Sequence, residues 1–365
     1  MDHIALSCSA LVLIGMLSSM ASRASSGLVA PLFLVDDESG KEGRRCDLLP
    51  DVRPLIAVFT QDMGGGEGGG GNGTSPVEKL AASYVKWLEQ AGARVVPLRR
   101  GDSPERVAAV MARADGLLFP GGAGNVPPSA RLAWKLALDA NAIGVPVPVF
   151  GTCLGFEWLM ELVSGDYGGE KILVSGMDSS NVSLPLKLRP AAATSRMLGG
   201  GGSVAELRRA LSTRALTMNN HHYGVIPAQF EAHTALGDFF EVLSTSNDRS
   251  GLEFVSTVEA KSELPVFGVQ WHPEKSQFEW GWKGNAPYEA IDHSPAAIEA
   301  SRHLAFGFVG HARRAACIAD GRGRTPLPDD MWSELVWQYN IESHEGAGFV
   351  QTYVIGPRTA GSVAV

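Results

Sequence analysis

The chain has 365 residues, of which 45% are hydrophobic and 19% charged, so it can form one large α/β domain or two smaller ones around an ordinary apolar core. Its formal net charge is −8 and no run of basic residues stands out, which argues against a nucleic-acid partner. An anionic substrate would therefore need positive charge that is concentrated locally.

Residues 1–24 are predicted to be a removable secretion signal. An apolar stretch, Ala10–Leu17, precedes the small residues Ser22 and Ala24, where a peptidase could cut. An uncleaved signal anchor is the alternative, although the apolar run is short for a spanning helix. No other apolar run reaches membrane length, so no membrane association is expected after the signal is removed. Residues 25–52 have no hydrophobic period and are predicted to be a leader or propeptide-like segment.

Buried strands and helices then alternate along the chain. Leu55–Thr60 is predicted to be a short buried strand, and the nearly pure glycine run Gly64–Gly73 a loop. Val77–Gln90 is predicted to be an amphipathic helix that is closed by Gly92, and Arg94–Leu98 to be the second strand.

The same alternation continues through the next helix and strand. Ser103 is expected to cap a helix that has Pro104 at its first position, and Gly116–Pro120 to be a strand that ends in Gly121–Gly122. This pattern predicts an α/β fold with a doubly wound, mostly parallel sheet flanked by helices. In such folds the functional site lies at the carboxyl ends of the strands.

A nucleophile is predicted within Pro146–Ser164. This stretch indicates a strand at Val147–Phe150, a sharp turn around Cys153, and an apolar helix. Gly151 and Gly155 flank the cysteine as in a G-x-S-x-G nucleophile elbow, with sulfur in place of oxygen. The helix N-terminus would favour a thiolate over a thiol. A small buried core residue is the alternative for an isolated cysteine, but the flanking glycines favour the elbow.

A base for this nucleophile is predicted within Pro265–Trp280. The strand Val266–Trp271 would deliver His272 and Glu274, whose side chains fall on the same side of an extended chain. Glu274 could then orient one imidazole nitrogen while the other faces a thiol. A surface His-Pro-Glu turn is the alternative for an isolated motif. Together with Cys153, the pair predicts a catalytic triad.

The remaining segments carry weaker signals. Gly165–Gly251 is less regular, with a helix expected near Val204–Leu211. The adjacent histidines His221 and His222 have no further Cys or His at chelating spacing, so no metal site is predicted.

Towards the C-terminus, Ser294 is expected to cap a long helix that has Pro295 at its first position. A last strand is expected at Gln351–Ile355. These elements divide the chain into a catalytic domain, 53–314, and a C-terminal extension, 315–365, that packs on it.

The two chemical motifs carry a family resemblance. GTCLGFEWL around Cys153 and GVQWHPEKSQFEW around His272 and Glu274 resemble the γ-glutamyl hydrolase (folate poly-γ-glutamate hydrolase) branch of the class I glutamine amidotransferase-like superfamily. The similarity runs from about Pro54 to near the C-terminus. Four further matches are Ala81–Leu98, Gly116–Gly122, Thr217–Gly224 and Gln351–Gly356.

The resemblance implies cysteine-dependent hydrolysis of γ-glutamyl bonds in folate or antifolate poly-γ-glutamates, through a thioester acyl-enzyme. Cys153 would be the nucleophile, His272 the base and Glu274 its orienting carboxylate. No metal or organic cofactor is expected, because the reacting groups all come from the protein.

The resemblance also implies roles for residues around the triad. The amides of Gly121, Gly122 and Leu154 would bind the oxyanion. His221 would line the cleft, and Glu157 is predicted to bind substrate with it.

Two other functions stay open. A glutaminase domain that serves a synthetase is the first, but that branch usually has glutamine four residues after its nucleophile, where this chain has Glu157. A non-catalytic binding protein of the same fold is the second, although all three triad positions hold competent residues. A homodimer is possible.

The expected compartment is the secretory route, ending in a vacuole or lysosome or outside the cell. The signal-like N-terminus and the sequons at Asn72 and Asn181 favour it, and both asparagines are predicted glycosylation sites. In such an oxidising compartment Cys46 and Cys317 could pair.

Overall fold

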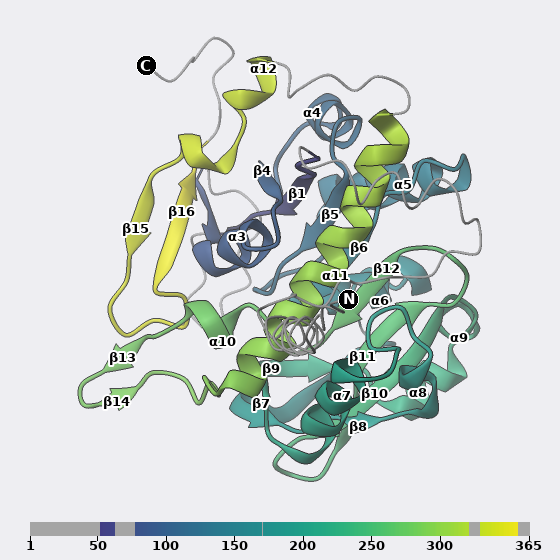
Figure 1. Ribbon diagram of the computed structural model, residues 1–365, viewed down its shortest axis with the longest axis vertical. Coiled ribbons are helices and arrows are strands. Elements are labelled where there is room, and N and C mark those ends of the chain that lie inside the picture. Colours follow the sequence, from purple (N-terminus) through teal and green to yellow (C-terminus); the bar gives the residue numbers. More distant parts are fainter. Residues whose placement is uncertain (1–51, 63–76, 170, 321–328, 357–365) are drawn as a thin grey trace, which may run out of the picture. The chain divides into compact units, whose positions relative to one another are not determined.

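The computed structural model describes residues 52–62, 77–169, 171–320 and 329–356. Its main element is an eight-stranded sheet (Figure 1) in the order β4-β1-β5-β6-β12-β11-β10-β8. The five strands from β4 to β12 pair in parallel, and the other three are antiparallel. Along this order the strands are Arg94–Leu98, Leu55–Phe59, Gly116–Phe119, Val149–Thr152, Val266–Val269, Glu253–Ala260, Phe240–Asn247 and Lys187–Leu188.

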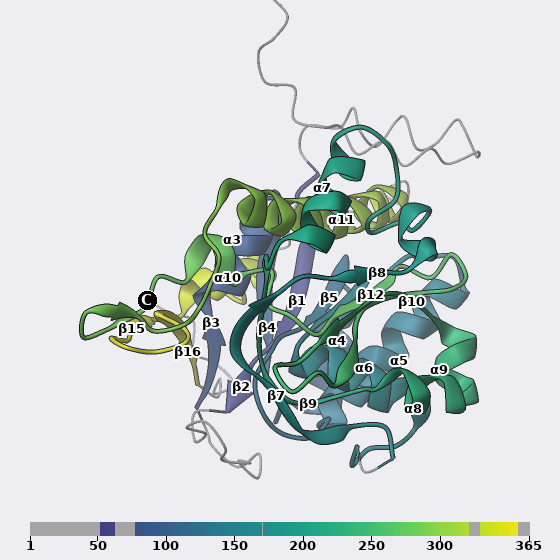
Figure 2. The same cartoon turned by 90° about the horizontal axis from the view of Figure 1, so that it is seen from below.

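Helices cover both faces of this sheet, as the predicted doubly wound fold requires (Figure 2). The helices α3 (Ala82–Glu89) and α11 (Pro295–Asp320) lie on one face, and α4 (Pro104–Met111), α5 (Pro128–Ala142) and α6 (Leu154–Ser164) on the other. The predicted fold class is confirmed.

Each face of the sheet has its own hydrophobic core, because side chains alternate along a strand. In β1, Ile56 and Val58 join the core under α3 and α11. Their neighbours Ala57 and Phe59 join the core under α4, α5 and α6. All four side chains are fully buried. Burial on both faces is why such strands are continuously apolar.

Smaller sheets stand beside the central one. One has the order β15-β16-β3-β2, and its strands are Ile341–Ser343, Gln351–Ile355, Glu78–Ala81 and Gln61–Asp62. A second pairs β7 (Val174–Leu184) with β9 (Thr217–Gly224), and β13 (Trp282–Lys283) with β14 (Ala286–Pro287) forms a hairpin. The remaining helices are α7 (Ser203–Thr213), α8 (Pro227–Ala232), α9 (Thr234–Phe239), α10 (Lys275–Phe278) and α12 (Asp329–Trp332).

The predicted helix Val77–Gln90 is wrong over its first turn. Glu78–Ala81 is strand β3, which pairs with β16, and helix α3 begins only at Ala82. These residues, Glu-Lys-Leu-Ala, carry no local signal that distinguishes a strand from the first turn of a helix. Pairing with β16 makes this segment a strand, and the β16 residue opposite Ala81 is Thr352, near the other end of the described chain.

Other local predictions are confirmed. Ser103 caps α4, since its hydroxyl accepts a hydrogen bond from the Arg106 amide at 3.3 Å, and Pro104 is the first helical residue. Ser294 accepts from the Ala297 amide at 3.4 Å at the start of α11.

Several sequence predictions fall outside the described residues. These are the signal 1–24, the segment 25–51 of the predicted leader, the loop Gly64–Gly73, Cys46 and Asn72. Within the described residues, no helix is both long and apolar enough to cross a membrane. Cys317 is disulfide-bonded, and its pairing with Cys46 stays a prediction.

The predicted boundary between 314 and 315 falls inside helix α11. The chain beyond it supplies β16, which pairs with β3 near the other end of the described chain. The small sheet therefore joins the two ends of the described chain.

Candidate active site

Cys153 stands at the turn between β6 and α6. Its backbone φ is 52° and its ψ is −109°, in a region that non-glycine residues rarely adopt. The side chain is only 5% exposed. A strained turn between a strand and a helix is the geometry of a nucleophile elbow, as the sequence predicted.

Steric contacts require glycine at the two positions that flank Cys153, Gly151 and Gly155. A Cβ on Gly155 would overlap the carbonyl oxygen of Phe119 on the neighbouring strand β5. A Cβ on Gly151 would lie 2.5 Å from the Gly155 carbonyl oxygen. The elbow can therefore pack this closely only with glycine at both positions.

Strand pairing brings His272 to Cys153. β6 and β12 are hydrogen-bonded parallel neighbours, with Thr152 opposite Val269, and the Cys153 amide donates to the Val269 carbonyl at 2.9 Å. His272 follows three residues after Val269 and is only 4% exposed. A Cβ on Gly121 would lie 2.6 Å from His272 Cε1 and 3.3 Å from Cys153 Cβ, so both residues border the same small space.

Glu274 orients the imidazole, although not in the way expected. Nδ1 of His272 lies 2.7 Å from Glu274 Oε1. The expected extended chain is wrong, because β12 already ends at Val269 and Glu274 adopts helical dihedrals as the N-cap of α10. A turn therefore creates the contact.

The charge state of His272 depends on these neighbours. Burial by itself lowers its pKa, but the charges of Glu274 and Cys153, with hydrogen bonds to both, raise the pKa to about 10. His272 is therefore held as an imidazolium through the neutral range. An imidazolium beside Cys153 can donate a proton to a leaving group.

Tyr84 on α3 is a site residue that the sequence did not reveal. Its hydroxyl accepts a hydrogen bond from the Gly121 amide at 2.7 Å and lies 3.4 Å from His272 Nδ1. Burial raises the pKa of Tyr84 well above its ordinary value, so the phenol stays protonated. Its position is one of many apolar ones in a buried helix, and only the fold shows that it faces the triad.

The predicted oxyanion donors are differently placed. The Gly121 amide donates to Tyr84, so in this structure it is engaged with a side chain. A Cβ on Gly122 would lie 2.8 Å from Gln61 Nε2. Leu154 is the first residue of α6, and none of the backbone hydrogen bonds among the described residues uses its amide. A helix N-terminus next to the nucleophile suits an oxyanion.

Glu157 lies one helical turn after Cys153 and is buried. Its Oε1 accepts a hydrogen bond from Gln270 Nε2 at 3.0 Å. Burial raises the pKa of Glu157 to about 8, and the Gln270 hydrogen bond opposes part of this shift. At acidic and neutral pH Glu157 is therefore an uncharged acid that can donate as well as accept.

His221 is buried on β9, and each of its ring nitrogens lies near an acceptor oxygen, to which the neutral ring can donate from one nitrogen at a time. Nδ1 lies 2.7 Å from the Tyr223 carbonyl oxygen, and Nε2 lies 3.2 Å from Asn219 Oδ1. Burial lowers the pKa of His221 to about 4. These contacts make it a poor alternative to His272 as the base.

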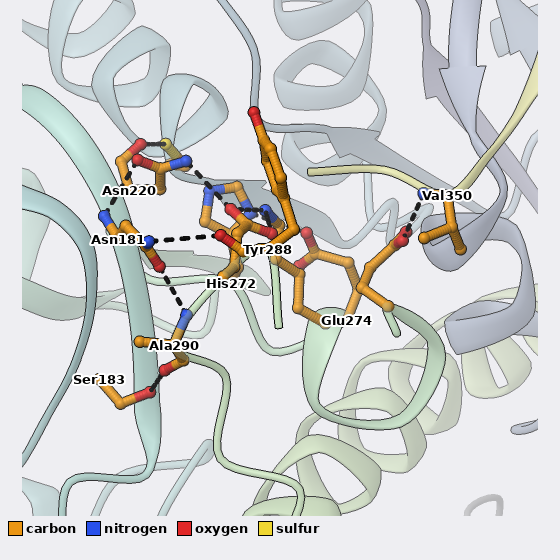
Figure 3. A network of polar contacts seen from close by, with 12 residues as sticks. Asn181, Ser183, Asn220, His272, Glu274, Tyr288, Ala290 and Val350 are labelled. Carbon is orange, nitrogen blue, oxygen red and sulfur yellow. Dashed lines mark hydrogen bonds and ion pairs between the residues drawn. The ribbon is translucent and has the colours of Figure 1, made fainter. Parts of the chain in front are cut away.

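A polar network surrounds the triad (Figure 3). The Cys153 thiol faces the Asn220 carbonyl oxygen at 4.0 Å, and Asn220 Nδ2 donates to Glu289 at 3.0 Å. Glu289 in turn accepts from Lys275 Nζ with both oxygens, each at 2.6 Å. The resemblance of TMNNHHYG, which contains Asn220, to the family was the signal that could have revealed this network.

The predicted glycosylation site Asn181 belongs to the outer edge of this network. Its side chain is exposed, with Oδ1 accepting from the Ala290 amide at 2.5 Å and Nδ2 lying 3.5 Å from the Tyr288 carbonyl oxygen (Figure 3). Among the described residues, no cluster of three or more His, Cys, Asp or Glu could hold a metal ion.

The geometry therefore brings together a buried cysteine, a histidine that borders the same small space, and a carboxylate that contacts the histidine. This combination suits acyl transfer through a covalent thioester.

Comparison with known proteins places this site in a family. The family model described as Peptidase C26 matches residues 54–274. "Gamma-glutamyl hydrolase 1" of Arabidopsis thaliana is 32% identical over 353 residues, which cover 92% of this chain and 93% of the plant protein. "Gamma-glutamyl hydrolase B" of Dictyostelium discoideum is 35% identical and covers 72% of each chain. "Gamma-glutamyl hydrolase" of Homo sapiens is 37% identical, over 64% of this chain and 71% of the human one.

The family match contains Cys153, His272 and Glu274, the three residues that the fold brings together around one buried space. On this evidence, the chain belongs to the peptidase C26 family.

Proposed function

We propose that this protein hydrolyses γ-glutamyl bonds, with folate poly-γ-glutamates as its substrate class and Cys153 as its nucleophile. The observation that carries the proposal is the placement of Cys153 and of the His272–Glu274 pair just beyond the ends of two adjacent parallel strands. The family membership and the names of the relatives support the type of bond.

Acylation begins with the Cys153 thiolate, which attacks the γ-carbonyl carbon of a glutamyl residue. The carbonyl π electrons move to oxygen, and the Leu154 amide at the start of α6 donates to this oxyanion. As the tetrahedral intermediate collapses, the C–N bond breaks and His272 gives its proton to the departing amine. A thioester on Cys153 remains.

Deacylation reverses these roles. Neutral His272 takes a proton from water as the water oxygen attacks the thioester carbonyl. Collapse of the second intermediate breaks the C–S bond and releases the γ-carboxyl product, so that thiolate and imidazolium are restored. Glu274 holds the imidazole orientation through both steps.

The experiment is incubation of the full chain with a folate pentaglutamate and measurement of product lengths by mass spectrometry. Shortened folates together with free glutamate or glutamyl peptides are expected, and none in a Cys153→Ala variant. Equal product in both proteins, or none in either while both are folded, would contradict the proposal. Ammonia released from free glutamine without shortening of the folate would instead support the glutaminase alternative.

We also propose that the protein follows the secretory route to a vacuole, a lysosome or the cell exterior. The support is the signal-like segment 1–24 and the two sequons.

A homodimer is proposed for the same protein, and light scattering after size-exclusion chromatography would measure its mass.

A further inference from the structure

Phe349 lies against the catalytic groups although it is far from them in the sequence. Its ring centroid is 6.3 Å from that of His272, with the planes at 65°, and 6.1 Å from that of Tyr84. The residue belongs to the segment that connects β15 to β16, beyond the end of the family match at residue 274. The side chain is partly buried.

The same ring covers a buried ion pair next to the triad. Lys275 Nζ lies 4.6 Å from the Phe349 ring centroid and contacts Glu289 at 2.6 Å. The side chains of Lys275 and Glu289 are only 2% and 3% exposed. The Lys275 ammonium lies over the face of the phenyl ring, and the His272 imidazole lies beside it in an edge arrangement. Lys275 directly follows Glu274, so one ring borders both the imidazole and the residue next to its carboxylate.

The backbone around Phe349 is held in place from several sides. The Val350 amide donates to Glu279 Oε2 at 2.7 Å (Figure 3). A Cβ on Gly348 would lie 3.4 Å from Glu289 Oε1, so the chain passes close to that carboxylate. Strand β16 then pairs with β3, which leads directly into the helix that carries Tyr84.

We propose that Phe349 is a positioning residue of the active site, which holds the imidazole of His272 and excludes water from its pair with Glu274. This inference rests on the proposed hydrolase function and deepens it. The C-terminal segment is then required for turnover rather than serving only as a support for the fold.

The physical reason is the dependence of ionic contacts on their surroundings. An aromatic ring against the imidazole lowers the local dielectric constant, which strengthens the attraction of His272 to its carboxylate. The ring also stabilises the Lys275 ammonium over its face. Removal of the ring would admit water and allow the imidazole to tilt, and small misplacements of a catalytic group are costly in rate.

The test compares Phe349→Ala and Phe349→Leu with wild type on the folate pentaglutamate. Phe349→Ala is expected to lower kcat about 10- to 100-fold with KM changed less than about 2-fold, since the ring acts through His272. Phe349→Leu keeps most of the apolar cover and should recover most of kcat. Val354→Ala, in strand β16 and paired with Lys79 on β3, is the matched control and should retain the wild-type kcat.

The outcomes separate the two proposals. An inactive wild-type protein would overturn the proposed function itself. An active wild type with an equally active Phe349→Ala variant would overturn only the positioning role, as would a rise in KM with kcat unchanged. If the alanine variant does not fold, the leucine variant decides: its kcat should lie a few-fold below that of Val354→Ala, and a kcat equal to that of Val354→Ala would overturn the positioning role.

Discussion

Nδ1 of His272 and Oε1 of Glu274 lie 2.7 Å apart in a site where their side chains are 5% and 0% exposed. A turn at the start of α10 produces this contact, so the imidazole and the carboxylate that contacts it come from the same short segment. The contact also fixes how the protein should respond to pH.

Replacement of Glu274 should change the pH dependence of stability. The folded protein holds a proton on His272 up to about pH 10, whereas an unfolded histidine loses it near pH ~6.5. The stability that this proton contributes to the folded protein is fully present below pH ~6.5 and is lost as pH rises through about 10. Glu274→Gln removes the charge of Glu274, which raises the pKa of His272 in the wild type, so the pKa of His272 falls in the variant. Between pH 6 and pH 10 the melting temperature of the variant should therefore fall less than that of the wild type. An equal fall in both proteins would contradict the claim that Glu274 raises the pKa of His272.

The triad substitutions should differ in severity. His272→Asn should lose nearly as much activity as a variant without the nucleophile, whereas Glu274→Gln should lose less, on the order of 10²- to 10⁴-fold in kcat. A His272→Asn variant with more than about a tenth of the wild-type rate would move the base elsewhere. Steady-state rates on the pentaglutamate measure both.

Cys153→Ala should abolish turnover and leave binding intact. The loss is expected to exceed about 10⁴-fold, because nucleophile and base act as a unit. The volume removed is small, so the melting temperature should change little. Calorimetric titration with an uncleaved pentaglutamate checks binding, and a variant that neither binds nor turns over would leave the nucleophile role unsupported.

Gly155→Ala should destabilise the protein, because its Cβ would overlap the Phe119 carbonyl oxygen. Backbone has to move, so we expect a loss of at least about 2 kcal/mol in unfolding free energy together with most of the activity. Gly310→Ala is the control, since nothing lies within 4 Å of a Cβ there and the residue is inside helix α11. It should be neutral or slightly stabilising. Urea unfolding of both variants measures the difference.

Much of the central sheet could be predicted from the sequence, because buried parallel strands leave short apolar runs between helices. The strands at Leu55, Arg94 and Gly116 follow this rule. β7 and β9 do not, since their sequences are largely polar and their pairing connects residues far apart. Nothing local could distinguish such strands from irregular chain.

The candidate site was predictable only where the backbone itself was unusual. The glycines around Cys153 and the His-Pro-Glu turn are visible as patterns. Tyr84 and Phe349 are ordinary apolar residues in the sequence, and they reach the triad only because β3 and β16 pair across almost the whole chain. Such contacts depend on topology, which a local pattern does not contain.

Glu157→Gln should make the protein more stable at alkaline pH. Burial raises the pKa of Glu157 to about 8, so the wild type loses stability as pH rises from ~4.5 through about 8. Glutamine cannot ionise and can still accept from Gln270. The variant should therefore melt several degrees higher than wild type at pH 9 and about equally at pH 5. The exposed Glu206→Gln is the control, and equal behaviour of the two variants would contradict the effect of burial.

The pairing of β6 with β12 has a consequence for how this protein can change. Cys153 and His272 follow neighbouring strands, and such strands lie about 4.8 Å apart whatever the chain does between them. The long segment that connects α6 to β12 contributes His221 and Asn220. It can gain or lose residues without altering the separation of nucleophile and base. The shape of the binding surface and the chemistry of bond cleavage are therefore separately adjustable in this fold.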